Sequence, residues 1–363
     1  MNPEDLSEWR TKIDAIDEEL LRLLQSRVEC ALAVGKIKTA RGLPLFDPAR
    51  EKFIYEKLTA RQTAMKGDLP ATAITAIFRE IISACRNAEH PVRVAFLGPA
   101  GTNTQEAALS HFGSAVEGYP CATPEEACRS VVMGDADYAV IAIENSIHGL
   151  VASNLDLLAT SSLSICAEVS LPIHHCLLSN STLEQIHVVY SHEHALAQCR
   201  NWLNAHLPGA ALIPITSTSR GAQMAAEETG AAAISSALAA DLYKVAIVAP
   251  NIEDIAGNKT RFFVVGGADK APKPSGRDKT SLAFLTPHRP GALVEVLGVL
   301  SRGGVNLQMI QSRPSRQRAW EYRFFADIQG HQADEKLGAA LEELRRHTVS
   351  YQVLGSYPEA AGE

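Results

Sequence analysis

Residues 258–265 read Asn-Lys-Thr-Arg-Phe-Phe-Val-Val, in which one hydroxyl and two cations stand against an apolar run that favours a β-strand. This stretch lies at the end of an acidic segment, from Pro91 to Lys270, that holds 8 Lys or Arg against 17 Asp or Glu. Cations amid so much negative charge are most useful where an anion must be held. We therefore expect Thr260 to present its hydroxyl beside a bound anion, at the entrance of a strand.

The composition of the whole chain is that of a soluble globular protein. Its 363 residues are 46% hydrophobic and 21% charged with a net charge of −7, which fits two or three domains and argues against general nucleic-acid binding. No apolar run approaches the roughly 20 residues of a membrane helix, and the acidic N-terminus lacks the features of a secretory signal, so a cytoplasmic protein is expected. Seven scattered cysteines without a close Cys-x-x-Cys pair favour reduced thiols over disulfides or zinc.

The sequence before Pro91 predicts an all-helical segment. Apolar residues recur at three- to five-residue spacing over residues 7–40, and two further helices are expected over residues 49–65 and 71–88. A helix of some 33 residues spans about 50 Å, more than one small domain covers. It needs a partner, most simply the same helix of a second subunit, so we expect a homodimer or a higher homo-oligomer.

Beyond Pro91 the pattern changes to alternating strands and helices. Strands are expected over residues 92–97, 138–143, 188–190, 213–215 and 231–235, and a helix over residues 105–112. This alternation indicates an α/β segment with largely parallel sheets, whose length allows two lobes with a cleft between them.

Residues 269–278, with two prolines and a glycine among charged residues, are the clearest linker in the chain. After them the expected order is strand, helix, two strands, helix and strand, which is a ferredoxin-like βαββαβ module. We therefore predict three domains, over residues 1–90, 91–270 and 279–358: an all-α dimerising domain, a two-lobed α/β domain of the periplasmic-binding-protein kind, and the ferredoxin-like module.

Charged residues of the helical segment could form an anion site. Arg27 and Lys38 are eleven residues apart, about three helical turns, and so fall on one face. Arg10 lies too far along the same helix to join them, unless an antiparallel partner helix brings it back. For any single residue, a solvated charge on a helix face is the simpler interpretation.

Taken together, these charged residues are harder to explain as solvated charges on helix faces. The segments 9–17, 27–29, 35–38 and 47–51, which include Asp-Pro-Ala-Arg-Glu, resemble the all-helical chorismate mutase family, over residues 5–90. Its members convert chorismate to prephenate by a Claisen rearrangement without proton transfer, so the protein has to fold the substrate and place positive charge at the ether oxygen. The resemblance implies that Lys38 donates to this oxygen. It implies that the carboxylates and the ring hydroxyl are bound by Arg10 of a second subunit, Arg27, Arg50, Asp47 and Glu51.

Two positions depart from the best-known variants of that family. Cys85 stands where a Ser often lies, and Glu89 stands where a Gln donates to the ether oxygen. A carboxylate cannot donate a hydrogen bond, so Glu89 must be protonated to fill this role. We therefore expect mutase activity to fall as the pH rises through the pKa of Glu89.

No single motif of the α/β segment is decisive. Gly-Pro-Ala-Gly-Thr at 98–102 leads into a helix start that suits anions but matches no nucleotide-binding fingerprint. Glu-Asn-Ser at 144–146 ends a strand, where α/β proteins often bind ligands, although a helix-capping turn explains it equally well. His174-His175-Cys176 are more simply a half-buried strand than a metal site, and Ser191-His192 lack a triad partner at recognisable spacing.

The order of these motifs is more specific than any one of them. Residues 98–102, 143–146, 171–177, 190–192, 198–199, 217–219 and 258–262 together resemble the prephenate dehydratase domain. In that family prephenate loses carbon dioxide and its ring hydroxyl to give phenylpyruvate, and departure of hydroxide needs a proton donor. The resemblance implies that Thr260 is this donor, aided by neighbours that stabilise its alkoxide or relay a proton. The implied neighbours and substrate ligands are Thr102, Glu144, Asn145, Ser146, Gln198 and Arg261. Asn103 and Ile147-His148 depart from the usual family residues.

In the last module, Gly-Ala-Leu-Val at 291–294 and Gln-Ser-Arg-Pro at 311–314 resemble the paired motifs of the ACT regulatory domain. There phenylalanine binds between two ACT domains and inhibits. The implied phenylalanine ligands are Gly291, Ala292, Leu293, Val294, Asn306, Leu307, Gln311 and Ser312. Gln311 replaces the usual Glu, which removes a negative charge from recognition of the amino group.

These resemblances imply a chain that makes phenylpyruvate from chorismate by way of prephenate, in phenylalanine biosynthesis, with phenylalanine as feedback inhibitor. No cofactor or metal is expected, because neither reaction transfers a hydride or requires a Lewis acid. Two alternatives stay open. One is a monofunctional dehydratase whose helical segment is only a dimerisation arm, and the other is a non-catalytic amino-acid sensor.

Overall fold

The computed structural model describes residues 3–42, 46, 48–315 and 321–360. They fall into two compact units: Met1–Val92 with Phe112–Glu117, and Arg93–His111 with Gly118–Glu363. Within the described ranges, no helix has both the length and the apolar character that a membrane span requires. All seven cysteines lie in the described ranges as free thiols.

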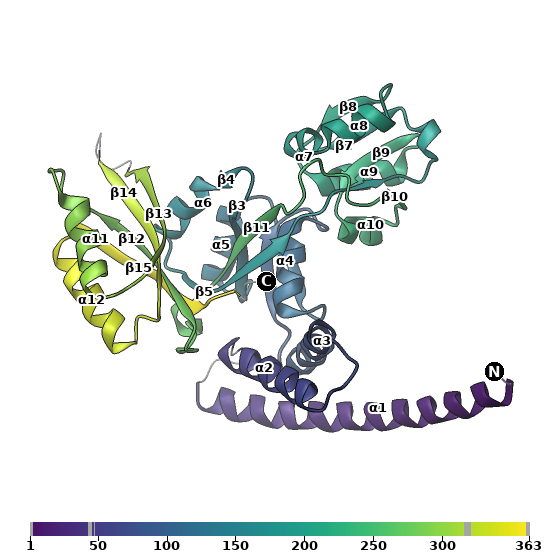
Figure 1. Cartoon of the computed structure of the whole chain (residues 1–363), viewed down its shortest axis with the longest axis horizontal. Helices are drawn as coiled ribbons and strands as arrows, with labels where there is room; N and C mark the ends of the chain where they lie inside the picture. The colour runs from purple at the N-terminus through teal and green to yellow at the C-terminus, as the bar shows by residue number, and fades with distance from the viewer. Residues whose placement is uncertain (1–2, 43–45, 47, 316–320, 361–363) are drawn as a thin grey trace. The chain divides into compact units, whose positions relative to one another are not determined.

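The described residues before Pro91 form three helices, which confirms the predicted all-α segment. They are α1 (Pro3–Ala40), α2 (Pro48–Ala64) and α3 (Ala71–Glu89), and α3 packs on both others. The N-terminal half of α1 extends beyond α2 and α3 (Figure 1). This half exposes a row of apolar side chains: Leu6, Trp9, Ile13, Ile16, Leu20 and Leu21.

The first α/β lobe is built on a sheet of order β2-β1-β3-β11-β5, with β4 paired to β3. The strands are β1 (Arg93–Leu97), β2 (Glu117–Cys121), β3 (Tyr138–Asn145), β4 (Gly149–Leu150), β5 (Ser164–Pro172) and β11 (Lys259–Gly266). The helices are α4 (Asn103–Phe112), α5 (Pro124–Met133) and α6 (Ala152–Leu158).

Strand β11, which carries the motif at 258–265, runs antiparallel to both of its neighbours, β3 and β5. β1 and β3 pair in parallel, whereas β4, like β11, is antiparallel to β3. The prediction of largely parallel sheets is therefore wrong for this lobe. β11 is antiparallel because the chain returns from the second lobe and enters the sheet against the direction of β3.

The second lobe contains a mixed sheet of order β10-β6-β9-β7-β8, in which β7 is parallel to β8 and β9, and β6 is antiparallel to β9 and β10. The strands are β6 (Cys176–Leu178), β7 (Val188–Ser191), β8 (Ala211–Pro214), β9 (Ala231–Ser235) and β10 (Ile247–Ala249). The helices are α7 (Glu193–Gln198), α8 (Arg200–His206), α9 (Thr218–Glu227) and α10 (Ala237–Tyr243). The chain passes between the lobes twice, over residues 173–175 and 250–258.

The last part of the chain confirms the βαββαβ order. It consists of β12 (Asp278–Leu285), α11 (Ala292–Arg302), β13 (Leu307–Pro314), β14 (Tyr322–Gln329), α12 (Glu335–Arg346) and β15 (Ser350–Pro358). The antiparallel sheet has the order β13-β14-β12-β15. Apolar side chains of both helices pack on one face of this sheet, around Leu282, Phe284 and Ile328.

The other face of that sheet packs on the first lobe in one shared core, which includes Phe263, Val265, Phe325, Leu354 and Tyr357. Gly355 makes the close approach possible, because a Cβ there would collide with the backbone oxygen of Ile165. Side chains alternate along a strand, so Arg261 shares the covered face of β11 with Phe263. Thr260 belongs to the opposite face.

Candidate functional site

A cavity of about 370 Å³ lies among the three helices of the first unit. It is lined by six of the eight residues predicted for a mutase site: Arg27, Lys38, Arg50, Glu51, Cys85 and Glu89. Arg27 and Lys38 reach the same cavity from α1, as their spacing predicts. Arg10 is exposed elsewhere on α1, and Asp47 lies outside the described residues.

Arg86, which sequence analysis did not single out, also lines this cavity. Its Nη1 donates to Glu51 Oε1 at 2.6 Å, and its Nη2 donates to the backbone oxygen of Phe112. Its guanidinium carbon lies 4.7 Å from the centre of the Phe46 ring. Burial raises the pKa of Glu51, and the charge of Arg86 opposes that rise. No local pattern could reveal this pair, because its members lie 35 positions apart on different helices.

Glu89 packs against the backbone of α1 at Gly35, the one interruption of the helical pattern. A Cβ added at Gly35 would lie 2.9 Å from Glu89 Oε2. Burial raises the pKa of Glu89, and the charges of Lys38, Arg86 and Arg27 oppose this rise. The cavity therefore combines several cations with a carboxyl group that holds its proton to a higher pH than usual.

In the first α/β lobe, Thr260 is hydrogen-bonded to Asn145, its register partner on β3. Asn145 Nδ2 donates to Thr260 Oγ1 at 2.9 Å and to Asn258 Oδ1 at 2.8 Å. Asn145 Oδ1 accepts from the backbone N–H groups of Ile147 and His148, each at 3.0 Å. Because the Thr260 oxygen accepts from Asn145, the hydroxyl proton can be directed to another acceptor.

Gln198, at the end of α7 in the second lobe, extends this network from the first lobe to the second. Its Oε1 lies 2.6 Å from His175 Nε2 and accepts from Asn258 Nδ2 at 3.4 Å. Its Nε2 lies 2.7 Å from His148 Nε2. Burial lowers the pKa of His175, which favours a neutral imidazole that donates from Nε2. His148, absent from the predicted site residues, is therefore tied to two of them.

Two further predicted residues form hydrogen bonds with backbone groups. Ser146 Oγ accepts from the backbone N–H of Lys259 at 2.9 Å, next to Thr260. Thr102 Oγ1 donates to the backbone oxygen of Leu97 at 2.8 Å and so fixes the turn at 98–102.

The residues His174 and His175 do not form the predicted half-buried strand. They lie in the passage between the lobes, and β6 begins only at Cys176. His174 Nδ1 lies 2.9 Å from Glu253 Oε1. No group of three or more His, Cys, Asp or Glu that could hold a metal ion was found among the residues described by the structure.

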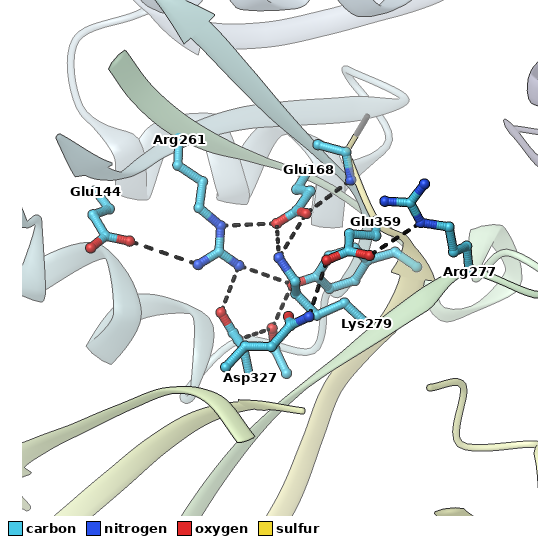
Figure 2. Close-up of polar contacts among 11 residues, drawn as sticks. Glu144, Glu168, Arg261, Arg277, Lys279, Asp327 and Glu359 are labelled. Carbon is cyan, nitrogen blue, oxygen red and sulfur yellow. Dashed lines mark hydrogen bonds and ion pairs between the residues drawn. The ribbon is translucent and has the colours of Figure 1, made fainter. Parts of the chain in front are cut away.

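Arg261 points into a cluster of acidic groups (Figure 2), and strand alternation puts Thr260 on the opposite face of β11. Its Nε donates to Glu168 Oε2 at 2.9 Å, its Nη2 lies 2.6 Å from Asp327 Oδ2, and its Nη1 lies 3.9 Å from Glu144 Oε2. Burial alone would raise the pKa of Glu168, but Arg261 and Lys279 hold it below its usual value. This placement of Arg261 and Glu144 differs from the expected role of both beside Thr260. The period of two along a strand predicts this separation, because consecutive residues such as Thr260 and Arg261 face opposite sides of a sheet.

In the last module, a cavity of about 240 Å³ lies at the start of α11. Four predicted ligands of phenylalanine line it, together with Tyr322 and Phe324 of β14: Gly291, Ala292, Leu293 and Val294. The other four are absent from its lining: Asn306, Leu307, Gln311 and Ser312. Gly291 has a φ of 82°, a left-handed conformation that favours glycine before a helix start.

The chain matches three family profiles in order: chorismate mutase type II over residues 9–90, prephenate dehydratase over residues 94–270, and the ACT domain over residues 280–346. A bifunctional chorismate mutase/prephenate dehydratase of Aquifex aeolicus is 43% identical over 359 residues, which cover 98% of this chain and 99% of that protein. The chain belongs to the bifunctional chorismate mutase/prephenate dehydratase family.

Solved structures match about three quarters of this family member. Prephenate dehydratase from Arthrobacter aurescens, in complex with L-Phe, is 36% identical with a TM-score of 0.69, over 74% of this chain and 90% of that one. GqqA, described as a novel type of quorum quenching acylase, is 31% identical with a TM-score of 0.68, over 74% of this chain and 98% of that one.

Proposed function

We propose that the chain converts chorismate to prephenate in its helical domain and prephenate to phenylpyruvate in its two-lobed domain, under feedback inhibition by phenylalanine. The full-length match to bifunctional relatives and the three family profiles in order support both activities. The observation that carries the proposal is the pair of sites itself. Cations line a cavity of the helical domain, and in the two-lobed domain the Thr260 hydroxyl accepts a hydrogen bond from the Asn145 amide.

For the mutase, the cavity supplies the groups that a Claisen rearrangement of a dianion needs. Arg27 and Arg50 bind the carboxylates of chorismate, with Arg10 of a second subunit completing the site. Lys38 and protonated Glu89 donate to the ether oxygen as it gains negative charge in the transition state. The exposed apolar row on α1 supports a dimer, because a second α1 would bury it.

For the dehydratase, Thr260 donates a proton to the hydroxide that leaves the prephenate ring. The Asn145 amide, 2.9 Å from Thr260 Oγ1, stabilises the negative charge that the oxygen acquires. Gln198, from the opposite lobe, closes the site against water through His148 and Asn258. Loss of carbon dioxide makes the ring aromatic, so this decarboxylation needs little further help from the protein.

For regulation, phenylalanine occupies the cavity at Gly291 and is enclosed by the β13 residues Gln311 and Ser312 of a second ACT domain. We further propose that the protein is cytoplasmic. We also propose that it forms at least a homodimer.

One experiment separates this function from its alternatives. The full chain and its Lys38→Ala and Thr260→Ala variants are given chorismate, and chorismate, prephenate and phenylpyruvate are followed with and without phenylalanine. The wild type should form phenylpyruvate, Lys38→Ala should leave chorismate, and Thr260→Ala should accumulate prephenate. A dehydratase with a structural arm would leave chorismate in every sample but convert added prephenate. A sensor would convert neither compound.

A further inference from the structure

We propose that Asp327 is a positioning residue through which the ACT domain acts on the dehydratase site, by holding the side chain of Arg261, which follows Thr260 in β11. This inference rests on the proposed function, because it requires that Thr260 carries the dehydration and that phenylalanine binds the ACT domain.

The first observation is the environment of Asp327 on β14. Its side chain is 2% exposed, and its Oδ1 accepts from Ser281 Oγ at 2.6 Å within the ACT sheet. Its Oδ2 lies 2.6 Å from Arg261 Nη2 of the dehydratase domain. A carboxylate this buried needs an opposite charge, and Arg261 supplies it. The Tyr357 hydroxyl, also from the ACT sheet, accepts from the same nitrogen at 3.3 Å.

The second observation is the position of Arg261 on β11. It pairs in register with Glu144, and the preceding residue, Thr260, pairs with Asn145. Toward β3 the register shifts directly after Arg261, so Thr260 and Arg261 are set apart from the regular ladder with β3, whereas their pairing with β5 is regular. A displacement of the Arg261 guanidinium therefore moves Thr260 relative to Asn145. Displacements of about 1 Å at a reacting group can change a rate by about a hundredfold.

The third observation connects Asp327 to the effector cavity. Tyr322 and Phe324 of β14 line this cavity, and Asp327 follows Phe324 by three residues, about 10 Å along the strand. The predicted phenylalanine ligands Gln311 and Ser312 lie on β13, opposite Phe325 and Phe324 of β14. Both halves of the predicted effector site thus adjoin the strand that carries Asp327.

Glu168 and Lys279 lie beside the ion pair between Arg261 and Asp327, and they fix the position of the Arg261 guanidinium. Lys279 Nζ, from the first ACT strand, lies 2.8 Å from Glu168 Oε1, while Arg261 Nε donates to Glu168 Oε2. One dehydratase carboxylate therefore bridges a cation from each domain (Figure 2). Glu168 belongs to the dehydratase domain and is held by both cations. Asp327 belongs to β14, so a shift of this ACT strand would move Asp327 and, with it, the guanidinium of Arg261.

The test uses the full-length Asp327→Asn variant, which keeps the shape of the side chain and an acceptor for Ser281 but removes the charge. Phenylpyruvate formation from prephenate is measured against phenylalanine concentration, and phenylalanine binding is measured by calorimetry without prephenate. We expect the half-inhibitory concentration to rise by about tenfold, a typical size for coupling between two sites, while the dissociation constant stays within about twofold. Tyr357→Phe should raise the half-inhibitory concentration by a smaller factor, and it serves if Asp327→Asn does not fold.

The control is Glu343→Gln, which removes an exposed ACT carboxylate that pairs with Arg302 at 2.8 Å, on the helical side of the domain. It should keep the wild-type inhibition curve. If phenylalanine inhibits the wild type and the Asp327→Asn and Tyr357→Phe variants equally, the role of Asp327 is overturned and the proposed function stands. A parallel loss of phenylalanine binding and of melting temperature would also overturn it, in favour of a purely structural role. A wild type that phenylalanine does not inhibit would overturn the proposed regulation as well.

Discussion

The Glu89 carboxyl group lies directly over Gly35 of α1, so closely that a Cβ at Gly35 would stand 2.9 Å from Glu89 Oε2 and 3.3 Å from its Cδ. Glycine in a helix interior is less favourable than alanine by about 1 kcal/mol. The helix nevertheless has glycine where the Glu89 side chain crosses it. The absence of a side chain at position 35 is thus what gives Glu89 its place in the cavity.

Gly35→Ala should separate stability from mutase activity. Alanine favours the helix, and the end of a flexible Glu side chain can move aside, so the melting temperature should stay constant or rise. Because Glu89 is displaced, chorismate turnover should fall by about tenfold to a hundredfold. Gly298→Ala in α11, where a Cβ would meet only the end of Arg302, is the matched control and should leave the mutase unchanged. Unaltered mutase activity in Gly35→Ala would contradict the role given to Glu89.

The pH profile of the mutase should depend on Glu89. Burial raises the pKa of its carboxyl group, and the protonated form is the hydrogen-bond donor. Activity should therefore be full below this pKa and fall about tenfold per pH unit above it. Glu89→Gln donates at every pH and should show no such decline, as measured by chorismate consumption. The same pH profile in wild type and variant would exclude this mechanism.

The ion pair between Arg86 and Glu51 should contribute to the stability of the helical domain. Arg86→Met leaves a buried carboxylate without its cation, which costs about 3–5 kcal/mol in comparable pairs. Adding Glu51→Gln removes the unpaired charge, so the double variant should be more stable than Arg86→Met alone in urea unfolding. Arg22→Met, which breaks the exposed pair with Glu19, should shift the unfolding midpoint far less. A purely additive double variant would show that the two side chains are not coupled.

Asn145→Asp should inactivate the dehydratase and spare the mutase. The aspartate keeps an oxygen that can accept from the N–H groups of Ile147 and His148, but it cannot donate to Thr260 Oγ1. It also places a negative charge where the proposed mechanism develops one. Prephenate turnover should fall by about a hundredfold to a thousandfold, as for other lost oxyanion donors. Chorismate consumption by the same sample is the control, and retention of full dehydratase activity would refute the role of Asn145.

The sequence by itself determined the elements and their order. The apolar period of three to five residues predicted α1, α2 and α3 to within a few residues, and the last module appeared in its βαββαβ order. Arg27 and Lys38 could be placed in one cavity because a helix repeats its geometry every 3.6 residues. Such periods are local properties of the backbone, so neighbouring residues suffice to read them.

Only the tertiary structure decided which partners the charged side chains have. Arg86 meets Glu51 across 35 positions, Arg261 meets Asp327 across 66, and β11 enters its sheet antiparallel because the chain returns from another lobe. Strand alternation separates Thr260 from Arg261, but it does not say what covers each face. That depends on the packing of distant segments, in which a buried charge takes the counter-charge that the fold brings to it.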